Sequence, residues 1–390
     1  MVNYYLYPDD WAYKEDGSTP SVLDGTDGTV RVHTPKFYGK SGSNGNKRWV
    51  RISLVKLDDS WIEIPELLID AYRNTVDNTV SATPKAVSVV NTTEAFRGGG
   101  NRAQFDGYLT TELETKDAFR SDLGKPRTNV SRANMRTYAT NAGSELLCYE
   151  YYKWIFYWNY VIEYANFNSQ AAYNAELTSD GYRQGGLGPG VTDWSNSATS
   201  WSGYNGTYPL TPCGYCNDIG NFTGIKDLVI PECTATNGTD TVATKTFKVP
   251  RWRGFDNPFG DIWTNLDGVV IVRAAANEIS TVYTTTNVSE FTDVVGEKTV
   301  AGYEVASDGY IKAFDLGETA EIIPSAVGGS ATTYICDYHY CNARSTALRT
   351  LLVGGSAGNG GYAGLGYFHS SYDVGGADSI VGFRTLNRVS

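Results

Sequence analysis

The segment Pro250–Gly268 reads PRWRGFDNPFGDIWTNLDG, and the rest of the chain can be placed around it. Proline and glycine flank Phe259, so the triplet at 258–260 predicts a tight turn that points one aromatic ring into the protein. From Ile262 onward, apolar and polar residues alternate until Asp267-Gly268, a pattern typical of a half-buried strand that ends in a turn. The aromatic side chains of this segment carry more apolar area than one turn can bury, and they predict a core seam: Trp252, Phe255, Phe259 and Trp263.

Four short motifs resemble, in the same order, those of the C-type lectin fold of the formylglycine-generating-enzyme type. That family has a helix end "EAEWEYAAR", an element "GN-V-W-E-W-x-D", a strand "RGGS" and a closing strand "IGFR". The counterparts in this chain are Trp158–Ala165, Gly260–Trp263 with Asp267-Gly268, Val353–Ser356 and Val381–Arg384. The resemblance covers roughly Glu145–Ser390 and implies an α+β fold with a C-type-lectin-like domain.

The chain is also similar to proteins of this fold encoded by tailed bacteriophages, particularly those that infect gut Bacteroides. The shared features are the aromatic helix, the stretch Asn166–Gln170, the glycine loop Gly185–Gly190, the "PFG-IW-DG" turn and the final "GG…GFR" run. The resemblance implies a virion fibre or decoration component, and some such proteins carry variable ligand-binding ends.

The 390 residues divide, by expectation, into a β-rich N-terminal attachment segment at 1–60 and a C-type-lectin-like domain at 61–390. Strand candidates in the first segment are Thr29–His33 and Trp49–Leu54. An exposed strand edge there could pair with the sheet of a neighbouring protein, although the segment could equally pack on its own core. Residues 269–335 predict a β-rich insertion with strands at Val269–Ala274, Gly302–Val305 and Tyr310–Phe314.

Three further segments carry helix or loop signals. The aromatic stretch Leu146–Ala165 predicts a helix enclosed on most sides, with Ser144 as its cap. The segment Ile64–Arg73 places a proline at a first helical position and predicts an amphipathic helix that ends near Asn74. The polar run Phe119–Ala142, with its scattered arginines, predicts a solvated loop.

Composition excludes several function classes. A net charge of −11 and a pI near 4.9 argue against nucleic acid as a partner, because phosphate binding needs a clustered basic surface. The first residues lack a basic stretch followed by an apolar run, so they do not resemble a signal peptide. The most apolar stretch carries Glu150, Lys153 and Glu163, and we expect no membrane insertion.

No set of residues predicts a catalytic or metal site. Cys213 and Cys216 have metal-ligand spacing without a second pair, and Cys336–Cys341 with His339 also lacks its other half. The three histidines form no serine-histidine-aspartate pattern. Formylglycine-generating enzymes use a reactive cysteine pair just after the "RGGS" strand, and no cysteine follows Cys341 here. We therefore expect no enzyme activity, cofactor or metal, with an oxidase-like member of this fold as an alternative.

The last forty residues predict a ligand-binding surface. Glycine-rich stretches at 358–361 and 375–376 enclose a polar and aromatic set, and strands at Leu351–Ser356 and Ile380–Leu386 would hold it in place. In phage relatives of this fold the same span is the variable ligand-binding surface. An equally weighted alternative is that these side chains only fill a hairpin. The predicted ligand-binding residues are Tyr362, Tyr367, His369, Ser371, Tyr372 and Asp373.

Together these observations predict a non-enzymatic structural protein on the virion surface, assembled in the host cytoplasm. A head fibre or capsid decoration is favoured because no heptads or repeats for a long shaft are present. The expected partners are other virion proteins, further copies of the chain in a dimer or trimer, and a host surface glycan or protein. The tip of a tail fibre and a free glycan-binding protein are the alternatives.

Overall fold

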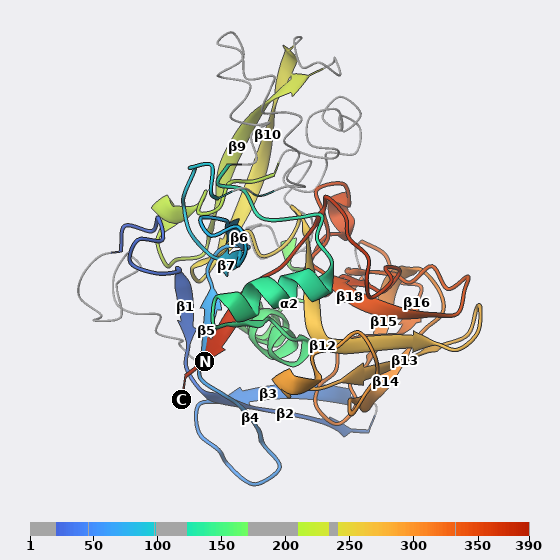
Figure 1. Ribbon diagram of the computed structural model, residues 1–390. Helices are drawn as coiled ribbons and strands as arrows, with labels where there is room; N and C mark the ends of the chain where they lie inside the picture. Colours follow the sequence, from blue (N-terminus) through green and yellow to red (C-terminus); the bar gives the residue numbers. More distant parts are fainter. Residues whose placement is uncertain are drawn as a thin grey trace.

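The computed structural model describes residues 21–45, 47–96, 98, 123–170, 210–233, 241–331 and 333–389; of 230–233 and 241–247 it describes the backbone only. The predicted glycine loop Gly185–Gly190 and the first twenty residues of the predicted attachment segment lie outside these ranges. The described chain is mostly β-sheet with few helices (Figure 1).

Nine strands form the largest sheet, which curls toward a barrel. Its end strands approach each other, because the Val305 N–H donates to the Pro324 carbonyl at 2.9 Å. The ninth strand, β20 (Val381–Gly382), runs parallel to β12. The other eight follow the order β14 (Thr299–Glu304), β13 (Ser280–Thr284), β12 (Trp263–Arg273), β18 (Ala347–Val353), β19 (Phe368–His369), β17 (Tyr338–Tyr340), β15 (Gly309–Asp315) and β16 (Ile323–Val327). The three strands predicted within 269–335 are confirmed by β12, β14 and β15.

Strand β12 contains the predicted turn instead of ending at it. The buried Phe259 and the hydrogen bond from Gly260 N–H to Gly354 O confirm the tight turn before the strand. At Asp267-Gly268, however, β12 continues through an irregularity in its pairing with β18, and Gly268 has a φ of 63°. A left-handed glycine lets a strand bulge without stopping. The expected half-buried pattern is also wrong, because almost every residue of β12 is buried.

A four-stranded sheet joins segments from the whole length of the chain in the order β1 (Arg31–Thr34), β5 (Leu67–Asp70), β21 (Thr385–Arg388) and β8 (Glu145–Leu146). Strand β1 confirms the first strand candidate. The helix expected at Ile64–Arg73 is wrong: β4 (Ile62–Ile64) and β5 occupy this region on either side of Pro65. Since β5 pairs with β1 on one side and β21 on the other, sheet hydrogen bonds replace the helical ones.

Three smaller sheets complete the β structure. The second strand candidate is confirmed by β3, which lies at the edge of one of them. Their strands are β3 (Lys47–Ser53), β2 (Phe37–Asn44) and β4; β11 (Phe255–Asp256), β10 (Thr241–Trp252) and β9 (Gly224–Cys233); and β6 (Thr75–Asp77) with β7 (Lys85–Val87).

The aromatic helix is buried, as predicted, but it begins later and is wound differently. Because Glu145 and Leu146 pair with β21, the helix starts at Tyr149 instead of near Ser144. It consists of α3 (Tyr149–Tyr152), a π-helical segment η2 (Lys153–Trp158) and α4 (Asn159–Tyr164). The π segment changes which side chains face inward, so every residue of η2 is buried while Ile162 is 44% exposed.

Helix α2 (Arg132–Asn141) replaces part of the predicted solvated loop. Its N-terminus is capped by Ser131, whose hydroxyl accepts from the Asn134 N–H. Arg132 is fully buried and pairs with Asp293, and Arg136 forms a bidentate pair with Asp267 at 2.6 and 3.0 Å. Arg132 and Arg136 are therefore neutralised by acids distant in sequence.

The remaining helical turns are short 3₁₀ segments: η4 (Asn217–Ile219), η5 (Val288–Glu290) and η6 (Gly360–Tyr362). No helix in the described ranges is long and apolar enough to cross a membrane.

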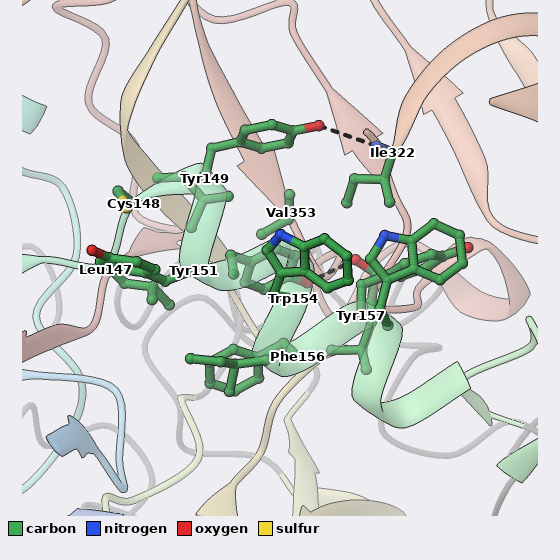
Figure 2. Packing of buried hydrophobic residues seen from close by; sticks show 14 of the residues in the cluster. Leu147, Cys148, Tyr149, Tyr151, Trp154, Phe156, Tyr157, Ile322 and Val353 are labelled. Carbon is green, nitrogen blue, oxygen red and sulfur yellow. Dashed lines mark hydrogen bonds between the residues drawn. The ribbon is translucent and has the colours of Figure 1, made fainter. Parts of the chain in front are cut away.

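The aromatic residues predicted to share one seam divide between two core clusters. The larger cluster encloses the aromatic helix together with Trp252, Phe255 and Phe259. Figure 2 shows part of it, including the hydrogen bond from the Ile322 N–H to the Tyr149 hydroxyl at 3.1 Å. Trp263 at the end of the turn segment and Phe383 near the closing strand share the smaller cluster.

Candidate functional site

The six predicted ligand-binding residues lie at different depths. Tyr367 and His369 are buried, with 4% and 6% of their surface exposed, whereas Tyr362 is 41% exposed. Ser371 and Tyr372 are half-buried, and Asp373 is exposed. The set therefore consists of a buried support and an accessible part, not of one continuous surface.

The buried residues Tyr367 and His369 pack against Trp263 of β12. Its ring lies 4.6 Å from that of Tyr367 and 4.5 Å from that of His369. Burial lowers the pKa of His369 to about 3, so the imidazole is neutral at physiological pH. Its Nε2 and the Ser371 hydroxyl share a hydrogen bond of 2.8 Å. So low a pKa makes His369 a poor proton acceptor, and its role here is to pack and orient.

The loop after β19 is fixed to β18 by Arg349. One guanidinium nitrogen donates both to the Ser371 carbonyl and to Asp373 Oδ1, each at 2.7 Å. The neighbouring Thr350 N–H donates to the Tyr372 carbonyl at 3.0 Å. The Tyr372 hydroxyl in turn donates to Asp378 at 2.8 Å. These bonds hold the half-buried tyrosine in one position against the sheet.

The accessible part extends to tyrosines that the sequence did not single out. The ring of Tyr362 lies 4.5 Å from that of Tyr338 and 5.2 Å from that of Tyr310. Tyr340, 37% exposed, lies on β17 two residues from Tyr338, and its ring is 5.1 Å from His369. We call Tyr310, Tyr338, Tyr340, Tyr362 and Tyr372 the tyrosine surface.

One sequence signal could have located Tyr338 and Tyr340. In the triplet Tyr338-His339-Tyr340 a strand places its first and third side chains on one face. His339 is fully buried between them, as the alternation requires. His339 and the flanking cysteines are residue types that bind metals, so the sequence pattern favours a metal site over a tyrosine surface here. Tyr310 carries no comparable signal, because it reaches the surface only through the pairing of β15 with β17.

Beneath β17, His339 belongs to a buried network centred on Glu304. Its Nε2 bonds Glu304 Oε1 at 2.9 Å, and its Nδ1 bonds the Ser307 carbonyl at 2.8 Å. Arg273 lies 3.5 Å from the second carboxylate oxygen, and the Ser370 hydroxyl donates to the first. Both ring nitrogens of His339 are thus engaged in holding β17 against the barrel.

The tyrosine surface is a neutral, hydroxyl-bearing aromatic area. Burial raises the pKa of Tyr310 to about 12, and it also raises the pKa of Tyr338. These phenols therefore stay protonated at physiological pH and can both donate and accept hydrogen bonds. Rings with a polar end are well suited to recognition surfaces that stay partly wet.

The four cysteines considered for metal binding are buried, free thiols, and so is Cys148; the four are Cys213, Cys216, Cys336 and Cys341. Burial raises the pKa of Cys213 and of Cys341 to about 12, so the nucleophilic thiolate is scarce. Within the described residues, no group of three or more histidine, cysteine or acidic side chains is arranged to hold a metal ion.

Comparison with known proteins finds weak similarity to solved structures. No family model and no curated protein matches the chain. Among solved structures, the chain is similar to the Major Tropism Determinant U1 Variant with a TM-score of 0.27 and 13% sequence identity, covering 100% of this chain and 74% of that chain. At this TM-score the similarity assigns neither a fold nor a function.

Proposed function

We propose that the chain is a non-enzymatic structural protein of a bacteriophage virion, a head fibre or capsid decoration, with a C-type-lectin-like domain that binds a host surface glycan or protein. The arrangement of three of its motifs supports the fold. Strand β12, which follows the turn motif, pairs with β18 through Thr264 and Val353, and with β20 through Trp263 and Val381. Motifs about a hundred residues apart in sequence are therefore neighbours in one sheet.

The tyrosine surface is the observation that carries the binding role. Four of its rings lie on β15, on β17 or on the loop that Arg349 fixes, and Tyr362 ends the 3₁₀ turn η6 with its ring against Tyr338. Little conformational entropy is therefore lost when a ligand binds. A tyrosine ring can stack on the apolar face of a sugar or on a protein side chain, while its hydroxyl bonds polar groups. Single contacts of this kind are weak. Several displayed copies would raise the overall affinity through effective concentration.

The binding role is tested by removing the ring of the exposed Tyr362 together with that of the half-buried Tyr338 against which it packs. Tyr338→Ala with Tyr362→Ala should reduce adsorption of particles to host cells roughly tenfold or more, because stacked aromatic contacts each contribute about 1 kcal/mol and act in many copies. Tyr303→Ala is the matched control, since Tyr303 is 53% exposed on β14 and does not belong to the tyrosine surface. Unchanged adsorption by the double variant, with near-wild-type circular dichroism, would refute the binding role.

The place on the particle needs a separate experiment. A density map of intact virions, or antibody labelling of their surface, distinguishes a head fibre or decoration from a tail-fibre tip. A chain that never purifies with assembled particles would instead be a free glycan-binding protein. For the enzyme alternative, copper- and oxygen-dependent turnover of a cysteine-containing peptide is the decisive measurement, and we expect none.

A further inference from the structure

Strand β3 lies at the end of its sheet and leaves one edge open. The order is β3-β2-β4, and β3 pairs with β2 over its full length, from Lys47 opposite Asn44 to Ser53 opposite Tyr38. No described strand pairs with its other side. The hairpin itself is firmly seated: a Cβ at Gly39 would lie 2.4 Å from the ring of the buried Trp154. The open edge therefore belongs to a rigid element.

The loop that follows β3 exposes three aliphatic side chains. Leu54, Val55 and Leu57 are 50%, 61% and 63% exposed. The loop is ordered by its own hydrogen bonds, because the Ser53 hydroxyl donates to the Val55 carbonyl at 2.7 Å and the Ser60 N–H donates to Asp58 at 2.9 Å. A structured loop that holds adjacent aliphatic side chains in water is typical of an interaction site.

We propose that this edge pairs with the β3 edge of a second copy of the chain. The strands would run antiparallel about a twofold axis at Val50, the middle residue of β3. This register pairs the full length of the strand and satisfies its free backbone groups. The aliphatic loop of each copy would then pack beside the hairpin of the other and be shielded from water.

The side chains of β3 fit this register. Antiparallel pairing about Val50 places Arg51 opposite Trp49 of the partner subunit, and each Arg51 already lies over its own Trp49 with 4.5 Å between the guanidinium carbon and the ring centroid. Each Arg51 would thus meet an aromatic ring across the interface, while Arg48 would face Ile52 and Lys47 would face Ser53, so no cation lies opposite another.

The ends of the two hairpins are also compatible. Among the described residues, Lys47 and Arg48 have no ion-pair partner. The loop beyond β3 carries Asp58 and Asp59, which pair with Lys40 and Lys56 of the same chain and stay largely exposed. The antiparallel arrangement sets each basic tip near the acidic loop of the other copy. It separates the two tips by about 20 Å, which exceeds the screening length in physiological salt.

The opposing interpretation is that Lys47, Arg48 and Arg51 guard the edge and keep the chain monomeric. Protection of the open edge against pairing explains the positive charges on β3. It leaves the aliphatic loop unexplained, because a protected edge would be followed by polar residues. The two interpretations predict different oligomeric states, so one measurement separates them.

Sedimentation and light scattering of the purified full chain should show a dimer at micromolar concentration. Replacing both Val55→Asp and Leu57→Asp should weaken dimerisation tenfold or more, because the interface would bury unpaired carboxylates. Phe222→Asp is the matched control, since Phe222 is 63% exposed on another part of the molecule. A monomeric wild-type chain, or a dimer that the paired aspartates leave intact, overturns the proposal.

Cross-linking tests the register directly. Under mild oxidation, Val50→Cys should form a disulfide between copies, because the two residues face each other on the axis. Ile52→Cys is the matched control: its partner position is Arg48, so the two introduced thiols lie too far apart to join. Equal cross-linking of both variants would refute the pairing. This inference is independent of the tyrosine surface, since adsorption and dimerisation are measured separately.

Discussion

Asp337, the residue just before Tyr338 on β17, is a buried carboxyl group enclosed by glycines. A Cβ at Gly364 or at Gly366 would lie 2.1 or 2.3 Å from its carboxyl oxygens, so the loop fits closely around it. The Gly366 N–H donates to Asp337 at 3.0 Å. Burial nevertheless raises the pKa of this carboxyl to about 7, because no cation of the described residues lies against it to offset the loss of hydration.

This raised pKa makes the stability of the protein depend on pH. The folded protein keeps the Asp337 proton up to about pH 7, whereas the unfolded chain releases it near pH 4. The stability that this bound proton contributes is therefore present in full below about pH 4 and is lost as the pH rises through about 7. Because each tenfold change in proton affinity is worth about 1.4 kcal/mol, a rise of about three pKa units makes the loss on the order of 4 kcal/mol.

Asp337→Asn should remove most of this dependence, since the amide stays neutral. We expect the free energy of unfolding, measured with urea, to rise in the variant relative to the wild type when the pH is raised from 5 to 8. Asp227→Asn serves as the control, because Asp227 is exposed on β9. If the difference between Asp337→Asn and wild type is the same at both pH values, the buried carboxyl does not titrate as described.

The sequence predicts the region of the tyrosine surface, but it does not predict which of the tyrosine rings reach solvent. Tyr362 and Tyr372 belong to the predicted span and do reach solvent. Tyr367 has the same residue type and lies in the same span, yet it packs under Trp263. Which rings point outward is decided by the pairing of β19 with β17 and β18, which is a property of the whole sheet.

Among the elements, β12 shows what a local pattern can and cannot specify. The Pro-Phe-Gly turn depends on neighbouring residues alone, and it forms as predicted. The Asp267-Gly268 pair is an equally good turn signal, yet the strand continues through it. Arg136 neutralises Asp267, and Thr285 N–H donates to the Gly268 carbonyl at 2.8 Å. Both partners are distant in sequence, so the local pattern could not reveal them.

The two wrong helix and loop assignments have the same origin. The segment at 62–70 has helical spacing, but β1 and β21 offer it sheet partners on both sides. The segment at 132–141 has the polar composition of a solvated loop, but Arg136 pairs with the buried Asp267 and the buried Arg132 pairs with the half-buried Asp293. By contrast, the aromatic helix was predicted well, because its apolar residues cover so much of its circumference that only a buried position is stable.

The bulge in β12 can be tested with two glycines of similar backbone geometry. Gly268 and Gly143 have φ values of 63° and 68°. A Cβ at Gly268 would lie 2.4 Å from the Thr285 carbonyl oxygen, whereas nothing lies within 4 Å of a Cβ at Gly143. Gly143→Ala should therefore cost only the left-handed backbone strain, roughly 1 kcal/mol.

Gly268→Ala should lower the free energy of unfolding by roughly 2 kcal/mol more than Gly143→Ala, since the barrel cannot relax around the added methyl group without shifting β13. Chemical denaturation of both variants measures the difference. Equal losses would mean that the strand tolerates a side chain at the bulge and that backbone strain alone requires glycine there.

At the scale of the whole molecule, the four-stranded sheet ties together segments that the sequence suggested were separate. Strand β5 lies between β1 and the C-terminal β21, and β21 also pairs with β8, which leads directly into the aromatic helix. Leu386 of β21 is fully buried in the larger core cluster. The N-terminal strand, the helix and the C-terminus therefore share one set of hydrogen bonds, while the division at residue 60 stays a prediction.

Such a sheet should make unfolding cooperative. Leu386→Ala should lower the free energy of unfolding by roughly 2 to 4 kcal/mol, because it leaves a cavity where three chain segments meet. Val389→Ala is the matched control, since Val389 is 41% exposed three residues later, and it should change stability by less than about 0.5 kcal/mol. Tryptophan fluorescence reports on the packing around the nine tryptophans, including Trp154 and Trp158 of the aromatic helix, and far-ultraviolet circular dichroism reports on the secondary structure. If the sheet couples them, both signals should move to lower denaturant together in Leu386→Ala and remain superimposable. Separate transitions would show that the closing strand stabilises only its own neighbours, and that the chain folds in parts.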